Sequence, residues 1–230
     1  MHQIPRYPYS VRHQNVYICS FRERVLEQCV TGLLILAVPF LALADVLLTG
    51  DTTPEFGLIE TFQASVLMIM CVLFAMMVLR DEESRPVSIW MLGLFLMMEV
   101  REHDWYFDSL GEHLWKVLVL GIFLTCFAFW YPLRSGTSET LRRFLNLKES
   151  DLYFLGALIV VVFSRLLGTG SLMGHLVRED VVWNVKTLVQ ESLEALGYCM
   201  LLSGTLRTYK RSSGSPLRGV HTGWIPRRQS

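Results

Sequence analysis

Residues 56–79 read FGLIETFQASVLMIMCVLFAMMVL, and Glu60 is the one charged side chain among them. A helix of this length matches a membrane's hydrocarbon core, which is about 30 Å thick and takes roughly 20 helical residues to cross. Backbone amides in lipid need partners within the segment, and the run lacks the alternation of a strand. The stretch therefore predicts a transmembrane helix.

Five further apolar runs lie on either side of this stretch. Across the chain, 52% of the 230 residues are hydrophobic and 18% are charged, against about 25% charged in a typical soluble domain. So much apolar surface does not fit inside one soluble core. We therefore expect an all-α fold, a polytopic membrane helix bundle with six transmembrane helices, near residues 27–48, 56–79, 87–107, 114–133, 151–172 and 181–203.

Lysine and arginine are distributed unequally between the segments outside these runs. The two terminal segments and the second and fourth loops hold 16 of the 21 basic residues, whereas the other three loops are acidic. Basic segments stay on the cytoplasmic side of a membrane. Both termini are therefore predicted to be cytoplasmic, in a bacterial-type inner membrane. The run ending at Ala42-Leu43-Ala44 resembles a signal-peptidase site, but the long polar stretch before it favours a retained first helix.

The segments outside the membrane are too short for a soluble domain, which needs about 50 residues. Residues 1–26 form a predicted cytoplasmic segment, 27–207 the six-helix transmembrane domain, and 208–230 a basic, disordered cytoplasmic tail. Residues 137–147 predict an interfacial helix with two arginines near anionic headgroups, so membrane lipid is an expected partner. The net charge of zero argues against a nucleic-acid partner. A homo- or hetero-oligomer is compatible with the sequence.

The known signatures of catalytic sites are missing from the chain. Its five cysteines are scattered without a CxxC pair, so all of them are predicted to be free thiols. No HExxH motif and no phosphate loop is present, and no GxSxG lies in a strand–helix context. Function must therefore be inferred from the ionisable residues inside the spans.

These ionisable residues gather in the outer half of the predicted bundle. With a rise of 1.5 Å per residue, they lie about 6–20 Å from the outer boundary on four helices. Charges within a membrane usually face a cavity or one another, so each of them is a candidate functional residue. The candidate binding residues are Glu60, Gln63, Glu99, His103, Arg165, Glu191 and Glu194.

Three functions are compatible with this polar layer. The first is proton- or ion-coupled transport of a small solute through an acid-rich cavity. The second is a metal-dependent enzyme acting on a lipid or headgroup, whose candidate catalytic residues are Glu99, Glu102, His103 and Glu191. A divalent metal could be held by Glu60, Glu99, His103 and Glu191, because carboxylate and imidazole suit zinc, manganese or iron. The third is a structural or assembly subunit whose charges form interhelical pairs.

Arg165 is the basic residue that the rise estimate places deepest in the outer half. Glu99 and Glu191 lie at a comparable depth, so Arg165 is expected to pair with at least one of them. The spacing also predicts that Glu99, Glu102 and His103 share one helix face. Together these expectations describe one acid-rich cavity between several helices.

Overall fold

The computed structural model describes residues 21–49, 57–169, 174 and 182–214, and within these ranges the chain is helical and has no strand. The expected all-α fold is therefore confirmed for this part of the chain. In chain order the elements are α1 (Phe21–Thr49), α2 (Leu58–Arg80), α3 (Arg85–Glu102), α4 (Asp104–Leu110), α5 (Leu114–Trp130), the 3-10 turn η1 (Tyr131–Leu133), α6 (Arg134–Leu145), α7 (Ser150–Leu158), the π-helix η2 (Ile159–Phe163), α8 (Ser164–Leu167) and α10 (Val182–Gly214).

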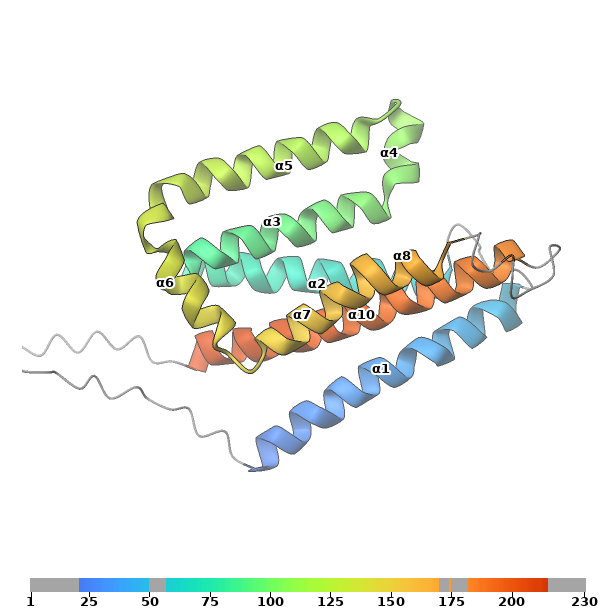
Figure 1. Ribbon diagram of the computed structural model, residues 1–230, viewed down its shortest axis with the longest axis horizontal. Coiled ribbons are helices and arrows are strands. Elements are labelled where there is room, and N and C mark those ends of the chain that lie inside the picture. Colours follow the sequence, from blue (N-terminus) through green and yellow to red (C-terminus); the bar gives the residue numbers. More distant parts are fainter. Residues whose placement is uncertain (1–20, 50–56, 170–173, 175–181, 215–230) are drawn as a thin grey trace, which may run out of the picture.

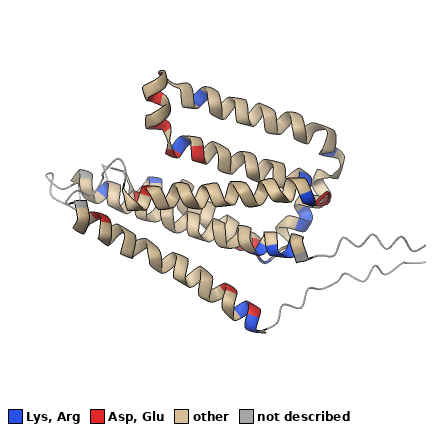
Figure 2. Ribbon diagram, turned by 180° about the vertical axis from the view of Figure 1, so that it is seen from behind, with Lys and Arg blue, Asp and Glu red and all other residues tan. Residues whose placement is uncertain are grey.

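Four helical stretches in the described ranges are long and apolar enough to cross a membrane. They are Phe21–Leu48, Leu58–Arg80, Leu114–Leu145 and Ser150–Leu167, and they coincide with the first, second, fourth and fifth predicted spans. The two remaining predicted spans fall on α3 and α10, which carry most of the ionisable residues of the polar layer. Figure 2 shows that charged residues lie towards the ends of the helices, with long uncharged stretches between them.

The helices end at different places from those predicted. The third span was expected to reach residue 107, but α3 ends at Glu102 and a separate helix, α4, follows. The fifth ends at Leu167 instead of residue 172. Residues 208–214, assigned above to the disordered tail, continue α10. Ion pairs explain this extension, because Lys210 and Arg211 contact carboxylates of α1 and of the residue before α7, at 3.1 and 2.9 Å.

The helices form a bundle with a central group and further helices along its two edges (Figure 1). α2, α7–α8 and α10 lie in the middle, α3 and α5 lie along one edge, and α1 lies along the other. The apolar core sits where α2, α3, α7 and α10 meet, around Phe74, Phe95, Tyr153 and Tyr198. The ring centroid of Phe74 is 5.5 Å from that of Phe95 and 6.4 Å from that of Tyr153.

The two outer helices expose large apolar side chains. On α5, Val117 and Phe129 are more than 60% exposed, as are Leu33 and Phe40 on α1. Exposing apolar surface to water costs free energy, about 25 cal/mol per Å², whereas contact with lipid has no such cost. The exposure therefore agrees with helices that face a membrane.

Polar contacts attach α1 to the central helices near both of its ends. The buried carboxylate of Asp45 accepts hydrogen bonds from the backbone amides of Leu58 and Ile59, at 2.7 and 2.9 Å. These amides begin α2 and have no partner within their own helix, so Asp45 caps α2 from another helix. Near the start of α1, the Arg207 guanidinium donates to the Thr31 hydroxyl at 2.8 Å.

The cysteines of the described ranges are free thiols, as expected, and Cys19 lies outside these ranges. Cys126 on α5 packs directly against Gly93 on α3, where an added Cβ would come within 2.6 Å of its sulfur. The missing side chain at Gly93 therefore allows α3 and α5 to approach closely. Buried thiols act here as small apolar groups.

Glycines also allow α7 to pack closely against α10. A Cβ on Gly156 would lie 2.9 Å from the backbone oxygen of Gly197, and a Cβ on Gly197 would lie 2.9 Å from the backbone oxygen of Gly156. Backbone atoms cannot move aside as a side chain can, so neither position has room for a larger residue. Close contacts between small residues of this kind are typical of helix pairs in membranes.

We predict that Gly197→Ala destabilises the protein by about 1–3 kcal/mol, because overpacking forces the two backbones apart. The measurement is thermal unfolding of the purified protein in detergent. Gly121→Ala on α5 is the matched control, since a Cβ there meets nothing within 4 Å and its midpoint should stay unchanged or rise slightly. Equal midpoints for Gly197→Ala and the wild type would contradict this account of the α7–α10 contact.

Candidate functional site

A polar cavity of about 610 Å³ lies at the end of the bundle where α2 and α10 begin and α3 and α8 end. We call this end the α4 end, after the short helix there. Both signs of charge line the cavity, and five carboxylates face two guanidinium groups. The lining residues are Glu60, Arg101, Glu102, Asp104, Trp105, Trp115, Arg165, Gln190, Glu191 and Glu194.

Glu194 lies at the centre of the polar contacts around the cavity, and it is only 1% exposed. One carboxylate oxygen is 3.2 Å from a guanidinium nitrogen of Arg165, and the other is 3.4 Å from one of Arg101. The Ser164 hydroxyl and the Gln190 amide each donate to the first oxygen, at 3.3 Å. A buried carboxylate needs such donors, because removal from water costs several kcal/mol. Glu194 thus joins α10 to α3 and α8.

The π-helix η2 orients two of these donors. Its hydrogen bonds span one more residue than those of an α-helix, so every residue after it is rotated by roughly 100° about the helix axis. Ser164 and Arg165 follow η2 directly and both contact Glu194. Gly168 then ends α8, where a Cβ would lie 2.7 Å from the Gln190 amide oxygen.

The break between α3 and α4 at His103 orients the other side of the cavity. The backbone changes direction there, so Asp104 and Trp105 of α4 line the cavity instead of continuing along α3. Below the break, Glu102 accepts a hydrogen bond of 2.6 Å from the buried hydroxyl of Tyr198 on α10. Its carboxylate also lies 3.7 Å from the guanidinium of Arg101.

Glu191 is held from behind by a residue of α2. The side-chain amide of Gln63 donates to the backbone oxygen and to the carboxylate of Glu191, at 2.8 and 3.1 Å. Gln63 is fully buried and does not line the cavity. It is a supporting residue that fixes the position of Glu191, which does line the cavity.

Five residues predicted from the sequence therefore come together around the cavity: Glu60, Glu102, Arg165, Glu191 and Glu194. Glu99 and His103 do not join them. They contact each other, with 3.8 Å between an imidazole nitrogen and the carboxylate. Glu99 and Glu102 were expected to share a helix face. In the structure Glu102 is hydrogen-bonded to Tyr198 of α10, whereas Glu99 contacts His103. The described residues also contain no group of three or more His, Cys, Asp or Glu side chains arranged to hold a metal.

The predicted partner of Arg165 was wrong. Arg165 pairs with Glu194, whereas Glu99 pairs with His103 and Glu191 is bound by Gln63. The depth estimate assumed straight α-helices with a fixed rise and ignored side-chain length. Arginine is long enough to reach another turn of a neighbouring helix, and the π-helix changes the direction in which Arg165 points.

Several cavity residues were not recognised as site residues from the sequence. Arg101 was not among the predicted site residues, yet it contacts the buried Glu194. Trp105 and Trp115 were not predicted either, and both line the cavity. Gln190 was missed altogether. Its spacing of four residues from Glu194 on one helix is a signal that could have found it.

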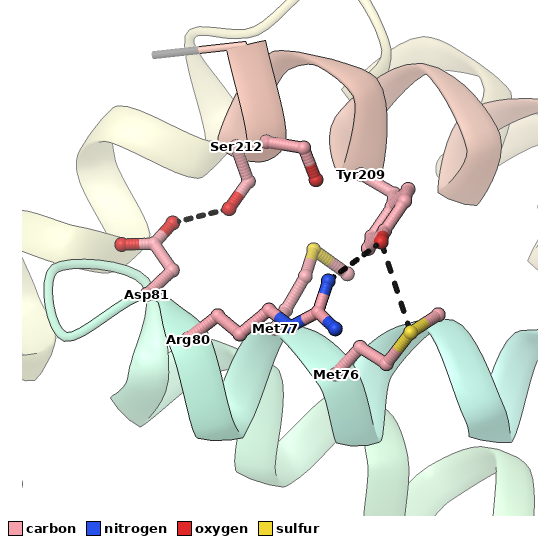
Figure 3. Close-up of a pocket in the computed structure, with 7 residues that line it drawn as sticks. Met76, Met77, Arg80, Asp81, Tyr209 and Ser212 are labelled. Carbon is pink, nitrogen blue, oxygen red and sulfur yellow. Dashed lines mark hydrogen bonds between the residues drawn. The ribbon is translucent and has the colours of Figure 1, made fainter. Parts of the chain in front are cut away.

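A second, smaller cavity of about 200 Å³ lies at the opposite end of α2 and α10 (Figure 3). The Asp81 carboxylate accepts a hydrogen bond of 2.7 Å from the Ser212 hydroxyl, and the Arg80 guanidinium donates to the Tyr209 hydroxyl at 3.4 Å. The Tyr209 hydroxyl also lies 3.7 Å from the Met76 sulfur. These contacts fix the last turns of α10 to the end of α2.

Comparison with models of protein families, with curated proteins and with solved structures finds no match to this chain. The function of the chain has to be inferred from the two cavities and from the charges that line them.

The contacts of Glu194 predict which pairs of residues are energetically coupled. Arg165→Leu and Glu194→Gln should each lower the thermal midpoint, and a double-mutant cycle between them should give a coupling of about 0.5–3 kcal/mol. The reason is that each single change leaves the other charge without its partner.

The matched control is a cycle between Arg165→Leu and Glu99→Gln, whose side chains are not in contact and should give additive effects. Thermal unfolding in detergent measures both cycles. Additivity in the Arg165–Glu194 cycle would show that this ion pair does not contribute to stability.

Proposed function

We propose that the chain is a six-span membrane protein that binds a small amine-bearing solute in the cavity at the α4 end and couples its movement to protons. In this proposal α3 and α10 also cross the membrane, both termini are cytoplasmic, and the α4 end faces the outside. The membrane proposed is a bacterial-type inner membrane. The observation that carries the function is the charge of the 610 Å³ cavity.

The charge balance of the cavity favours a cation. Its five carboxylates and two guanidinium groups carry a formal charge of −3 when all are ionised. Glu194 contacts both Arg101 and Arg165, and Glu102 lies 3.7 Å from Arg101, so these two carboxylates balance the charge of the two guanidinium groups. Glu191 lines the same cavity, and the hydrogen-bond donor to its carboxylate is the neutral side-chain amide of Gln63. A carboxylate near an apolar environment attracts a cation more strongly than it does in water.

The tryptophans support an amine over a bare metal ion. Trp105 and Trp115 line the cavity, and aromatic faces attract ammonium groups with about 0.5–2 kcal/mol. The Trp115 ring already shows this contact, because the Lys116 ammonium lies 5.4 Å from its centroid. No group of metal-binding side chains is arranged in the described residues, so the metal-dependent enzyme gains no support from the geometry.

Movement of the solute is supported by the relation of the two cavities. They lie at opposite ends of α2 and α10, and the apolar core around Phe74, Phe95 and Tyr153 lies between them. Access from one side with an apolar barrier on the other is what one state of an alternating-access transporter requires.

Proton coupling is supported by the position of Glu191. Its carboxylate lines the cavity and accepts a hydrogen bond from the neutral Gln63 amide, so a proton and the ammonium group of a solute compete for the same oxygens. Binding of the amine would then be accompanied by release of a proton, and the charge of the cavity would change with its occupancy.

The contacts of Glu194 favour a second candidate function, that of a structural or assembly subunit. Glu194 joins three helices, as expected if buried charges act as interhelical pairs. The two candidates differ in Glu191, which contacts a neutral amide and is not in an ion pair within the described residues. A transporter needs the charge of Glu191, whereas a structural pair does not.

The six-span arrangement makes a prediction about topology. Alkaline-phosphatase fusions in a bacterial host should be active after residues 52, 111 and 176 and inactive after residues 82, 147 and 220, because the enzyme folds only outside the inner membrane. Colony colour and enzyme assays on whole cells measure this. Activity of the fusion after residue 220 would contradict a cytoplasmic C-terminus.

The transport proposal predicts proton flux in proteoliposomes. With a pH dye inside and an inward gradient of choline, lysine or putrescine, wild-type protein should change the lumenal pH faster than empty liposomes. Glu191→Gln should abolish the difference, because the cavity loses a carboxylate that attracts the amine.

Glu82→Gln is the matched control, since this glutamate is 83% exposed at the other end of α2 and should transport normally. Thermal unfolding shows whether each variant is folded. If wild-type protein and empty liposomes agree for all three amines, transport is wrong and the structural role is favoured.

A further inference from the structure

We infer that the amine bound in the cavity belongs to a membrane lipid, and that the cavity binds a phosphoethanolamine headgroup while a neighbouring apolar surface contacts the acyl chain. This inference rests on the amine-binding cavity of the proposed function, and it replaces the free solute with an amine carried by a lipid headgroup. Three features support it: the two signs of charge in the cavity, the apolar surface beside it, and the way the helices around it pack.

The cavity offers partners for both charges of a zwitterionic headgroup. Arg101 and Arg165 each contact Glu194 through one terminal nitrogen, and their side chains are 39% and 47% exposed. Their other N–H groups leave room for a phosphate, which guanidinium groups bind well. Glu191 and the two tryptophans provide the environment for the ammonium group. A headgroup that carries only a negative charge would contact the two arginines and would not use Glu191 or the tryptophans.

Apolar side chains lie on the same face of α3 as Arg101, further along the helix from the cavity. Trp90 and Leu94 lie eleven and seven residues before Arg101, which places all three on one face of the helix. Leu94 is 44% exposed. On α5, Phe123 is 43% exposed and its ring lies 5.7 Å from the Trp90 ring. We call Trp90, Leu94 and Phe123 the apolar ledge.

The packing of the helices leaves the apolar ledge accessible from the side of the bundle, where the proposed membrane would lie. In the described part of the chain, α5 packs mainly along α3, and α8 packs mainly along α10. The cavity lies between these two pairs, since Trp115 comes from α5 and Arg165 from α8. A ligand whose polar group occupies the cavity can therefore have its apolar part on the ledge, within the hydrocarbon region.

A soluble amine would not use the ledge, and this separates the lipid from other ligands. Each methylene placed on an apolar surface away from water contributes about 0.8 kcal/mol, but a lipid chain within the bilayer is already away from water. The ledge therefore contributes a shape on which the chain can lie and little hydrophobic free energy, and the headgroup contacts provide the specificity. An aminophospholipid should consequently be preferred over an acidic phospholipid with the same chains.

The test is native mass spectrometry of the full chain released from detergent, with added phosphatidylethanolamine, phosphatidylglycerol, ethanolamine or dodecylamine. We expect phosphatidylethanolamine to bind at least tenfold more tightly than phosphatidylglycerol, a difference of about 1.4 kcal/mol. Glu191→Gln should remove this preference, and Glu82→Gln should retain it. Phosphatidylethanolamine with a photoactivatable acyl chain should crosslink to peptides containing Leu94 or Phe123.

Leu94→Trp fills the ledge and should weaken phosphatidylethanolamine binding while leaving ethanolamine binding unchanged. Crosslinking of the wild type tests the ledge independently if this variant does not fold. Equal binding of the two phospholipids would overturn the inference. Tighter binding of ethanolamine or dodecylamine than of the lipid would overturn it while leaving an amine-binding cavity. Binding of none of the four would overturn both the inference and the proposed function.

Discussion

A carboxylate enclosed by apolar helices must receive charged or polar donors, and Glu194 receives them from two neighbouring helices as well as its own. Arg101 fixes the end of α3, Arg165 fixes the short helix α8, and Gln190 comes from α10 itself. Because each donor has to reach the same two oxygens, the relative positions of three helices are constrained at one point. The cavity exists because these helices meet at their charged groups and not at their apolar faces.

The two halves of the bundle are therefore held together by different forces. At the α4 end the contacts are few, polar and directional, and they surround open space. Towards the other end, Phe74, Phe95 and Tyr153 pack against one another, and the paired glycines of α7 and α10 bring the backbones close together. Close apolar packing resists movement, since it has no alternative arrangement of similar energy. The polar half, in contrast, can exchange one set of charged partners for another.

The sequence predicts the positions of the helices well, and it predicts their contacts poorly. Long apolar runs are a property of the chain itself, so α1, α2, α5 and α7 were expected almost where they lie. The layer of ionisable groups was also expected, because charges within a span are rare. The partner of each ionisable group was not predicted, since pairing depends on how far each helix is rotated about its own axis. The break at His103 and the π-helix before Ser164 both change that rotation, and neither has a clear signal in the sequence. Arg165 was consequently assigned to the wrong carboxylates.

The contact between Asp45 and the start of α2 has a consequence for how the protein enters a membrane. The first amides of a helix lack partners in their own backbone, and lipid supplies none. Those of Leu58 and Ile59 are satisfied only when α1 lies beside them, because their acceptor is a side chain of α1. Conversely, the Asp45 carboxylate gains two amide donors when α2 lies beside it, which lowers the cost of placing it in lipid. Each helix thus completes the other, which favours insertion of α1 and α2 together as a hairpin during synthesis over insertion one after the other.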